Sequence, residues 1–332
     1  MTTLSALPDS RAPLDSETAA AAFGAMLDGC TSDEENFRFL SDMADRDETS
    51  IEIASAARAM RERMIRVEAP KGTIDVCGTG GDGAHSLNVS TAVAIVVAAA
   101  GVPVAKHGNR AASSLAGGAD TLEALGLNLD RASTRAEETL ADLGIAFLFA
   151  QKHHPALTKL ASVRKRIGRR TVFNLTGPVC NPAGVTRQLI GVARPDFMPV
   201  YAEAIALLGT ESTMLVAGDE PLDELSIAGP STIIRIGACG SGSIHVTPAD
   251  AGLPSHDLSS IRGGDASHNA AALRRLLTGE TGAYRDAVLL NAAAALIVAG
   301  EATALAEGVE EAAEVIDKGL AKALLDCWIA FR

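Results

Sequence analysis

A glycine-rich loop comprises Gly78-Thr79-Gly80-Gly81-Asp82 and separates an apolar run from a long Ala/Val/Ile segment. Glycines allow positive φ and close backbone approach to a ligand, and the unpaired N–H groups at a helix N-terminus favour phosphate oxygens. The segment has neither the Lys-Ser/Thr ending of a P-loop nor the dinucleotide-binding pattern. On its own, it is equally consistent with an anion site and with a plain tight turn.

A second polar loop follows the predicted strand 102–105 and reads Lys106-His107-Gly108-Asn109-Arg110. Ligands of open parallel sheets bind at the carboxyl ends of the strands, where this loop and the glycine-rich loop would both lie. A solvated basic turn would also explain Lys106 and Arg110. Two polar loops at successive strand ends nevertheless favour a site for a polyphosphate.

Two adjacent acids, Asp223 and Glu224, follow the predicted strand 212–216. Mg²⁺ binds one or two carboxylates, keeps several waters and shares phosphate oxygens. The pair therefore suits Mg²⁺ at a strand end, although acidic surface turns are also common. His153-His154 has no third nitrogen or sulfur ligand at a recognisable spacing, so zinc is not expected.

A basic stretch at 164–170 is unusual in an acidic chain and precedes a Gly/Pro/Asn loop at 174–182. One inward-pointing arginine of this stretch could pair bidentately with a carboxylate. A solvated helix face is the alternative interpretation. No Gly-x-Ser-x-Gly pattern is present, so covalent hydrolase chemistry has no support.

Helix and strand patterns alternate along most of the chain. Residues 16–64 are helical throughout, with a capping pattern Ser32-x-x-Glu35 and a helix start at Thr49. Strand patterns alternate with helical patterns from 74 to 216, which predicts parallel β-α-β units. These strands are expected at 74–77, 102–105, 145–149, 189–192 and 212–216, with further strands at 232–236 and 243–247 and C-terminal helices at 267–277, 283–299 and 303–325.

We therefore expect an α/β fold made of a small all-helical domain and a larger α/β domain, whose mostly parallel central sheet is flanked by helices. The 332 residues are too many for one small core, which also favours two domains. The helical domain would comprise residues 1–70, and the α/β domain would begin at residue 71.

The composition restricts partners and compartment. The net charge of −12 opposes binding to nucleic acid and to anionic membranes. Five widely spaced cysteines read as buried free thiols, as expected in a reducing cytoplasm. The longest apolar stretches are shorter than the ~20 residues of a membrane span, and no export signal is visible.

Taken together, the motifs closely resemble those of the anthranilate phosphoribosyltransferases, which catalyse the second step of tryptophan biosynthesis after the branch point. The similarity extends from about residue 16 to residue 325 and includes segments 269–270 and 290–293. The motifs that carry it are 78–82 with 88–91, 106–114, 117–120, Arg164 with 174–182, and Asp223-Glu224.

This resemblance implies transfer of the 5-phosphoribosyl group from phosphoribosyl pyrophosphate to the amine of anthranilate, giving N-(5-phosphoribosyl)anthranilate and pyrophosphate. It implies that part of 150–190 completes the helical domain of residues 1–70, and that 71–150 and 190–332 form the α/β domain. It also implies two Mg²⁺ ions per active site, an active site at the hinge between the domains, and a homodimer formed through the helical domains. It also implies a cytoplasmic enzyme.

The same resemblance assigns residues to roles. The catalytic residues are Lys106, Asp223 and Glu224, and the metal ligands are Ser90, Asp223 and Glu224. The phosphoribosyl pyrophosphate site comprises Gly78, Thr79, Gly80, Gly81, Asp82, Ser86, Asn88, Ser90, Thr91, Lys106, His107, Gly108, Asn109 and Ser114. The anthranilate site comprises Gly78, His107, Asn109, His154, Arg164 and Gly177.

Three departures from the family pattern lie next to these residues: Thr176 in place of an aliphatic residue, Ser86-Leu87 in place of threonine-phenylalanine, and Thr158 where some members have an aromatic residue. Two other functions remain as alternatives. One is a pyrimidine nucleoside phosphorylase-like enzyme, which would be longer and carry a different motif after the second strand. The other is a nucleic-acid-binding relative without transferase activity, which the net charge opposes.

Overall fold

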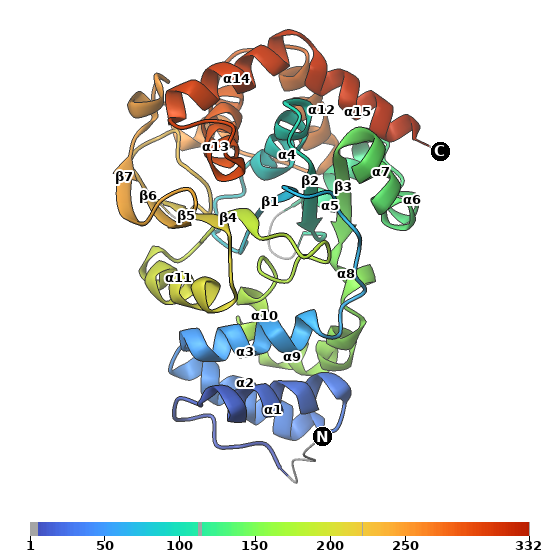
Figure 1. Ribbon diagram of the computed structural model, residues 1–332, viewed down its shortest axis with the longest axis vertical. Helices are drawn as coiled ribbons and strands as arrows, with labels where there is room; N and C mark the ends of the chain where they lie inside the picture. The colour runs from blue at the N-terminus through green and yellow to red at the C-terminus, as the bar shows by residue number, and fades with distance from the viewer. Residues whose placement is uncertain (1–5, 112–114, 221, 332) are drawn as a thin grey trace. The chain divides into compact units, whose positions relative to one another are not determined.

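The computed structural model describes residues 6–111, 115–220 and 222–331. Contacts divide the chain into two units (Figure 1). Unit 1 comprises Met1–Arg66, Gln151–Pro182 and Pro199–Gly209, and unit 2 comprises Val67–Ala150, Ala183–Met198 and Thr210–Arg332. This division differs from the boundaries expected from the sequence in one segment, since 199–209 groups with unit 1.

Unit 1 is helical because local signals start and stop its helices. Ser32 and Thr49 cap two successive helices, each in a capping box with a glutamate three residues later. The first capping box and the helix start at Thr49 were predicted from the sequence. The helix before them ends at Gly29, with φ +76°. The helices of this unit are α1 (Ser16–Asp28), α2 (Asp33–Asp45), α3 (Ser50–Arg61), α9 (Ala161–Ile167), α10 (Val172–Leu175) and α11 (Met198–Leu207), with α8 (Ala150–His153) and η1 (Pro155–Leu160) at the start of its middle segment.

Unit 2 is built on one sheet of seven strands in the order β3-β2-β1-β4-β5-β6-β7. The strands from β3 to β5 run parallel, and β6 and β7 add antiparallel neighbours. The predicted fold class is confirmed, and the sheet is mostly parallel. The strands are β1 (Ile74–Gly78), β2 (Val104–Gly108), β3 (Ile145–Phe149), β4 (Arg187–Gly191), β5 (Ser212–Gly218), β6 (Ser231–Gly237) and β7 (Gly242–Val246).

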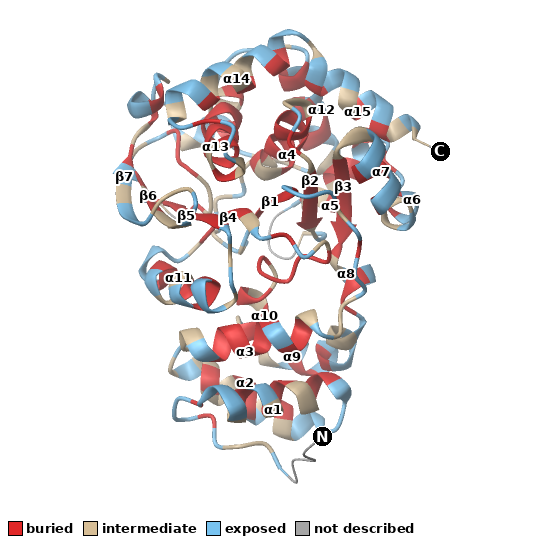
Figure 2. Cartoon of the chain, viewed as in Figure 1, coloured by how far each residue is buried: buried red, intermediate tan, exposed pale blue. Residues whose placement is uncertain are grey.

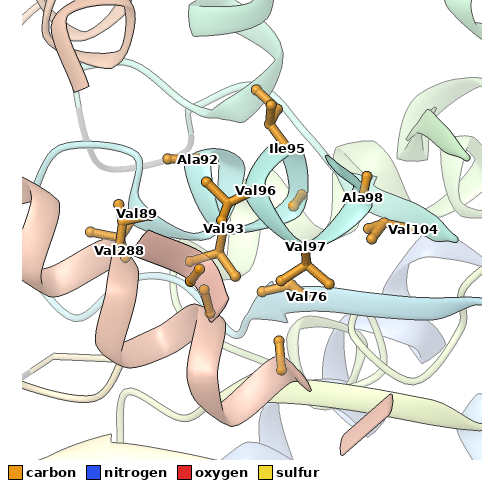
Figure 3. Packing of buried hydrophobic residues seen from close by; sticks show 14 of the residues in the cluster. Val76, Val89, Ala92, Val93, Ile95, Val96, Val97, Ala98, Val104 and Val288 are labelled. Carbon is orange, nitrogen blue, oxygen red and sulfur yellow. The ribbon is translucent and has the colours of Figure 1, made fainter. Parts of the chain in front are cut away.

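The core of unit 2 forms between this sheet and its helices. α4 (Val89–Ala99) is apolar over its whole circumference and is buried on nearly every face. Figure 3 shows Val97 of α4 beside Val76 of β1, and Val89 beside Val288 of α13 (Ala283–Ala299). Figure 2 shows β2 and β3 buried along their length, as expected for strands covered on both faces.

The remaining helices of unit 2 pack at the sides of the sheet and over α4 and α13. The single helix expected at 303–325 is wrong, because Gly319 takes φ +71° and separates two helices. Gly308 allows the first of these to approach α13, since a Cβ there would lie 2.7 Å from the Cα of Ala293. These helices are α5 (Gly118–Leu125), α6 (Leu129–Thr134), α7 (Ala136–Leu143), α12 (Ala266–Leu277), α14 (Leu305–Asp317) and α15 (Leu320–Ala330), with short 3₁₀ turns at Pro195–Phe197, Pro248–Ala251 and Leu258–Ile261.

Candidate active site

A cavity of about 300 Å³ opens in unit 2 at the carboxyl ends of β1 and β2, where the topology of the sheet predicts a ligand. Both polar loops and the acid pair contribute to it. Its lining consists of Cys77, Gly78, Thr79, Gly80, Gly81, Asn88, Ser90, Thr91, Lys106, His107, Gly108, Asn109, Arg110, Ala111, Gly117, Gly118, Asp223 and Glu224.

The glycine-rich loop takes backbone conformations that other residues rarely adopt. Gly80 and Gly81 have φ of +65° and +74°. The Thr79 N–H donates to the Gly191 carbonyl at 2.9 Å, and its hydroxyl accepts from the Ala193 N–H at 3.0 Å. These bonds fix the loop to the end of β4, with the Gly80 and Gly81 backbone facing the cavity.

Lys106 lies inside β2 and not in a loop after it, because parallel pairing with β3 continues through Gly108. Its side chain is buried, and its ammonium group donates to the Val76 carbonyl at 2.7 Å and to the Ser90 hydroxyl at 3.2 Å. Burial lowers the pKa of Lys106, while the carboxylate of Asp75 opposes that shift. The alternative of a solvated basic turn is therefore wrong for Lys106, whose amino group is held in place at the cavity wall.

The two acids reach the cavity from the loop after β5. Asp223 accepts the Gly80 N–H at 2.7 Å, and Glu224 accepts the Ser90 N–H at 3.3 Å. Desolvation, followed by the charge of Asp82, raises the pKa of Asp223 to about 7. Desolvation and the charge of Asp223 likewise raise the pKa of Glu224 well above its usual range. The site therefore holds two acids whose charged forms a bound cation would stabilise.

The start of α4 forms the floor of the cavity. Asn88 is its N-cap residue, with its side chain turned to other partners. Its Oδ1 accepts from Thr121 at 2.5 Å and from Asn269 at 2.9 Å, and its Nδ2 donates to the Ala116 carbonyl at 3.2 Å. The Val89 N–H bonds to the Leu87 carbonyl and the Ser90 N–H to Glu224, so α4 contributes to the cavity the positive end of its dipole, which favours an anion.

The charges of the cavity fit a metal-bound polyanion better than a free one. Lys106 is its buried cation, and Arg110 is already paired with Asp120 at 2.8 Å and with Glu123 at 2.5 Å. Asp223 and Glu224 would repel phosphate unless a divalent cation lay between them and the ligand. Among the described residues, no group of three or more His, Cys, Asp or Glu side chains could hold a metal alone, so a ligand would have to supply oxygens.

The structure brings most of the predicted donor-site residues together. Asp82 and Ser86 lie outside the lining: Asp82 accepts the Asp223 N–H at 3.3 Å behind the loop, and Ser86 forms a β-bridge with Arg262. Ser114 lies outside the described residues. The lining residues Cys77, Arg110, Ala111, Gly117 and Gly118 were not among the predicted site residues, although the motifs 106–114 and 117–120 contain four of them.

Three predicted anthranilate residues, His154, Arg164 and Gly177, belong to unit 1. His154 is buried, and burial together with the charge of His153 lowers its pKa to about 4, so it is neutral at pH 7. Arg164, on α9, is half-buried, and burial lowers its pKa. Within the described residues no carboxylate pairs with Arg164, whereas Arg166 pairs with Glu34 at 2.8 Å.

The departures at Thr176 and Leu87 concern buried positions. The Thr176 hydroxyl donates to the Phe173 carbonyl at 3.2 Å and lies 3.0 Å from the Met60 sulfur, so its polar group is satisfied inside unit 1. Thr158 bonds to the Pro155 carbonyl in an exposed turn.

Of the five cysteines expected to be buried, Cys77 and Cys180 are buried, Cys239 is half-buried, and Cys30 and Cys327 are exposed; all are free thiols.

Known proteins resemble this chain over nearly its full length. An anthranilate phosphoribosyltransferase of Novosphingobium aromaticivorans is 64% identical over 324 residues, covering 98% of each chain. The chain belongs to the anthranilate phosphoribosyltransferase family. The model of the α/β domain of a glycosyl transferase family also matches residues 70–322. The predicted family resemblance is thus confirmed.

Solved structures of this anthranilate phosphoribosyltransferase family share the fold. The enzyme of Thermus thermophilus is 42% identical with a TM-score of 0.91, covering 97% of this chain and 96% of that one. The enzyme of Saccharomyces cerevisiae, solved with phosphoribosyl pyrophosphate and Mg, is 29% identical with a TM-score of 0.87, covering 96% and 93%. That yeast enzyme has also been solved with 4-fluoroanthranilate.

None of the helices in the described part of this chain combines the length and the apolar composition that a membrane span requires.

Proposed function

We propose that this chain transfers the 5-phosphoribosyl group from phosphoribosyl pyrophosphate to the amine of anthranilate, releasing pyrophosphate, as a pentosyltransferase of tryptophan biosynthesis. One observation carries the proposal. In a member of this family, the glycine-rich loop, the buried Lys106 and the acids Asp223 and Glu224 meet in one cavity. The alternatives, a nucleoside phosphorylase and a nucleic-acid-binding protein, have no comparable support.

The cavity suits the donor substrate. Its glycine-rich loop offers backbone N–H groups, the start of α4 offers the positive end of a helix dipole, and Lys106 offers a fixed charge. We assign to donor binding the predicted residues that line the cavity, namely Gly78, Thr79, Gly80, Gly81, Asn88, Ser90, Thr91, Lys106, His107, Gly108 and Asn109. Asp82 and Ser86 remain proposed donor residues outside this lining, and Ser114 remains a proposed donor residue that lies outside the described residues.

Departure of pyrophosphate is the difficult step, because the ribosyl C1 then carries positive charge in an oxocarbenium-like state. We propose that Ser90, Asp223 and Glu224 hold Mg²⁺, with two ions per site. Bound Mg²⁺ would neutralise the charge that builds on the leaving pyrophosphate. Lys106 and the loop N–H groups act on the same oxygens, and their fixed geometry requires no reorganisation during the reaction.

Anthranilate must present its amine in line with C1, which is a positioning task. We propose that Arg164 binds the anthranilate carboxylate, and that His154, Gly177, Gly78, His107 and Asn109 contribute to the acceptor site. The absence of a carboxylate beside Arg164 in the described residues supports this role, because a half-buried guanidinium gains most from an anionic partner. An arylamine is weakly basic and its cationic adduct loses a proton readily, so no general base is assigned.

We further propose a homodimer formed through unit 1 and activity in the cytoplasm. Ile51 and Leu207 are large apolar side chains exposed in unit 1, and their burial between two copies would favour association. Nucleic acid and membranes are not proposed partners, given the net charge of −12.

The test follows the loss of anthranilate fluorescence as purified protein, phosphoribosyl pyrophosphate and Mg²⁺ are mixed. We expect loss of the signal only when all three components are present, and no loss in excess EDTA. Release of thymine from thymidine and phosphate by the same sample would favour the phosphorylase alternative. Stable anthranilate fluorescence under every condition would overturn the proposal.

A further inference from the structure

Asn291 is a buried polar residue of α13 that no part of the proposed mechanism uses. Its Oδ1 accepts the Leu225 N–H at 2.9 Å, and its Nδ2 donates to the Leu225 carbonyl at 3.0 Å. The second Nδ2 proton goes to the Ala287 carbonyl of its own helix at 2.9 Å. One side-chain amide therefore binds both backbone groups of a single loop residue 66 positions away.

Leu225 directly follows the acid pair. Its side chain is buried in the core, so the Asn291 contact fixes its backbone where the apolar packing fixes its side chain. Asn291 also lines a small cavity together with Ser90, Asp223 and Glu224, which places its amide immediately behind the acids. The carboxylate ends of the acids are held separately, by the Gly80 and Ser90 N–H groups.

We propose that Asn291 is a positioning residue for metal binding: by fixing the backbone of Leu225, it holds Asp223 and Glu224 at the spacing that Mg²⁺ requires. This inference rests on the proposed function, in which that acid pair binds Mg²⁺. Metal ligands generally depend on such supporting hydrogen bonds, and removal of one commonly costs 10- to 100-fold in metal affinity. Leucine at this position would keep the branching and the number of side-chain heavy atoms of asparagine but could not bond either backbone group of Leu225.

The experiment compares wild type with Asn291→Leu, using initial rates against Mg²⁺ at saturating substrates and calorimetric titration of Mg²⁺ into protein with pyrophosphate. We expect the half-saturating Mg²⁺ concentration and the calorimetric dissociation constant to rise about tenfold or more. The KM for anthranilate should stay within about twofold. Leu296→Ala is the control, because it truncates a fully buried side chain of the same helix without removing a hydrogen bond to Leu225, and it should lower the melting temperature without changing Mg²⁺ affinity.

Unchanged Mg²⁺ affinity in Asn291→Leu, or an equal loss in Leu296→Ala, would overturn the inference. Should Asn291→Leu fail to fold, Asn291→Ser provides the same measurement, since its hydroxyl is too short to bind both backbone groups of Leu225. Failure of the proposed function gives a different result. In that case, wild type itself would be active in EDTA, and Asp223→Asn with Glu224→Gln would retain Mg²⁺ binding.

Discussion

Arg164 differs from Arg166 on the same helix because, among the described residues, it has no acidic partner. An arginine–carboxylate contact that is partly desolvated is worth ~1.5–3 kcal/mol, or roughly ten- to a hundred-fold in affinity. Arg164→Ala should therefore raise the KM for anthranilate by about that factor and leave the KM for phosphoribosyl pyrophosphate nearly unchanged. Steady-state kinetics with each substrate varied in turn measure both values.

Two further variants test this assignment. Arg164→Lys should recover only part of the loss, because an ammonium group cannot reproduce the planar guanidinium fork. Arg166→Ala should leave both KM values near wild type, since Arg166 pairs with Glu34 and stacks on Phe37 at 3.8 Å. If Arg164→Ala raised only the KM for phosphoribosyl pyrophosphate, Arg164 would bind the donor and the assignment to anthranilate would be wrong.

Glu52 is a fully buried carboxylate in unit 1. Burial alone would raise its pKa, but hydrogen bonds from Arg46, Thr49 and Leu14 outweigh burial and lower it below 4.5. A lowered folded-state pKa means that the carboxylate stabilises the fold above pH 4.5 and loses this effect as pH falls through the folded-state pKa.

We accordingly expect Glu52→Gln to lower the free energy of unfolding by about 3–5 kcal/mol at pH 7, because it leaves Arg46 half-buried without its charge partner. The difference from wild type should shrink as the pH falls below about 4. Urea unfolding at a series of pH values measures it. Glu314→Gln, which breaks an exposed pair with Lys318, should change stability by less than about 1 kcal/mol at every pH. A pH-independent effect of Glu52→Gln would contradict the assignment.

At the scale of elements, β4 and the acid loop are in close contact. A Cβ at Gly191 would lie 1.5 Å from the Asp223 carbonyl oxygen and 2.5 Å from its carbonyl carbon. Gly191→Ala must therefore displace the acid loop backbone, and we expect at least a tenfold loss of kcat/KM together with a higher half-saturating Mg²⁺ concentration. Gly229→Ala is the matched control, because its Cβ would meet no atom within 4 Å and its φ is not positive. Equal activity of the two variants would show that the acid loop tolerates displacement.

The elements also show which features can be predicted from sequence. Ser32, Thr49 and the glycine-rich loop carry their signals within a few residues, so the helix starts and the loop followed from local pattern. Lys106 was predicted to lie in a loop because a charged residue usually ends an apolar strand pattern. In the structure the strand continues through Lys106, because it is paired with β3. Asn291 could not be assigned, because its partner Leu225 is distant in sequence and an asparagine within an alanine-rich helix carries no local signal of that contact.

At the scale of the whole molecule, a homodimer through unit 1 can be tested by mass. Sedimentation equilibrium at micromolar concentration should give about twice the chain mass of 34.1 kDa. Ile51→Lys with Leu207→Lys should weaken association without unfolding the chain, since charge is unfavourable in an apolar interface and both side chains are exposed in the monomer. Leu320→Lys, which changes an equally exposed site in unit 2, should leave association unchanged. A monomeric wild type would refute the dimer.

The hydrogen bond between Gly80 and Asp223 joins residues 143 positions apart. Asn291, which holds the backbone of Leu225, lies still further toward the C-terminus. Such long-range pairings form slowly during folding, because extended chain segments must close before any contact is gained. During synthesis from the N-terminus, the glycine-rich loop and β2 therefore leave the ribosome long before the residues that complete their pocket. A nascent chain that ends before α13 already contains the glycine-rich loop but lacks Asn291, which holds the backbone of Leu225 next to the acids. Donor binding is therefore among the last properties that the growing chain acquires.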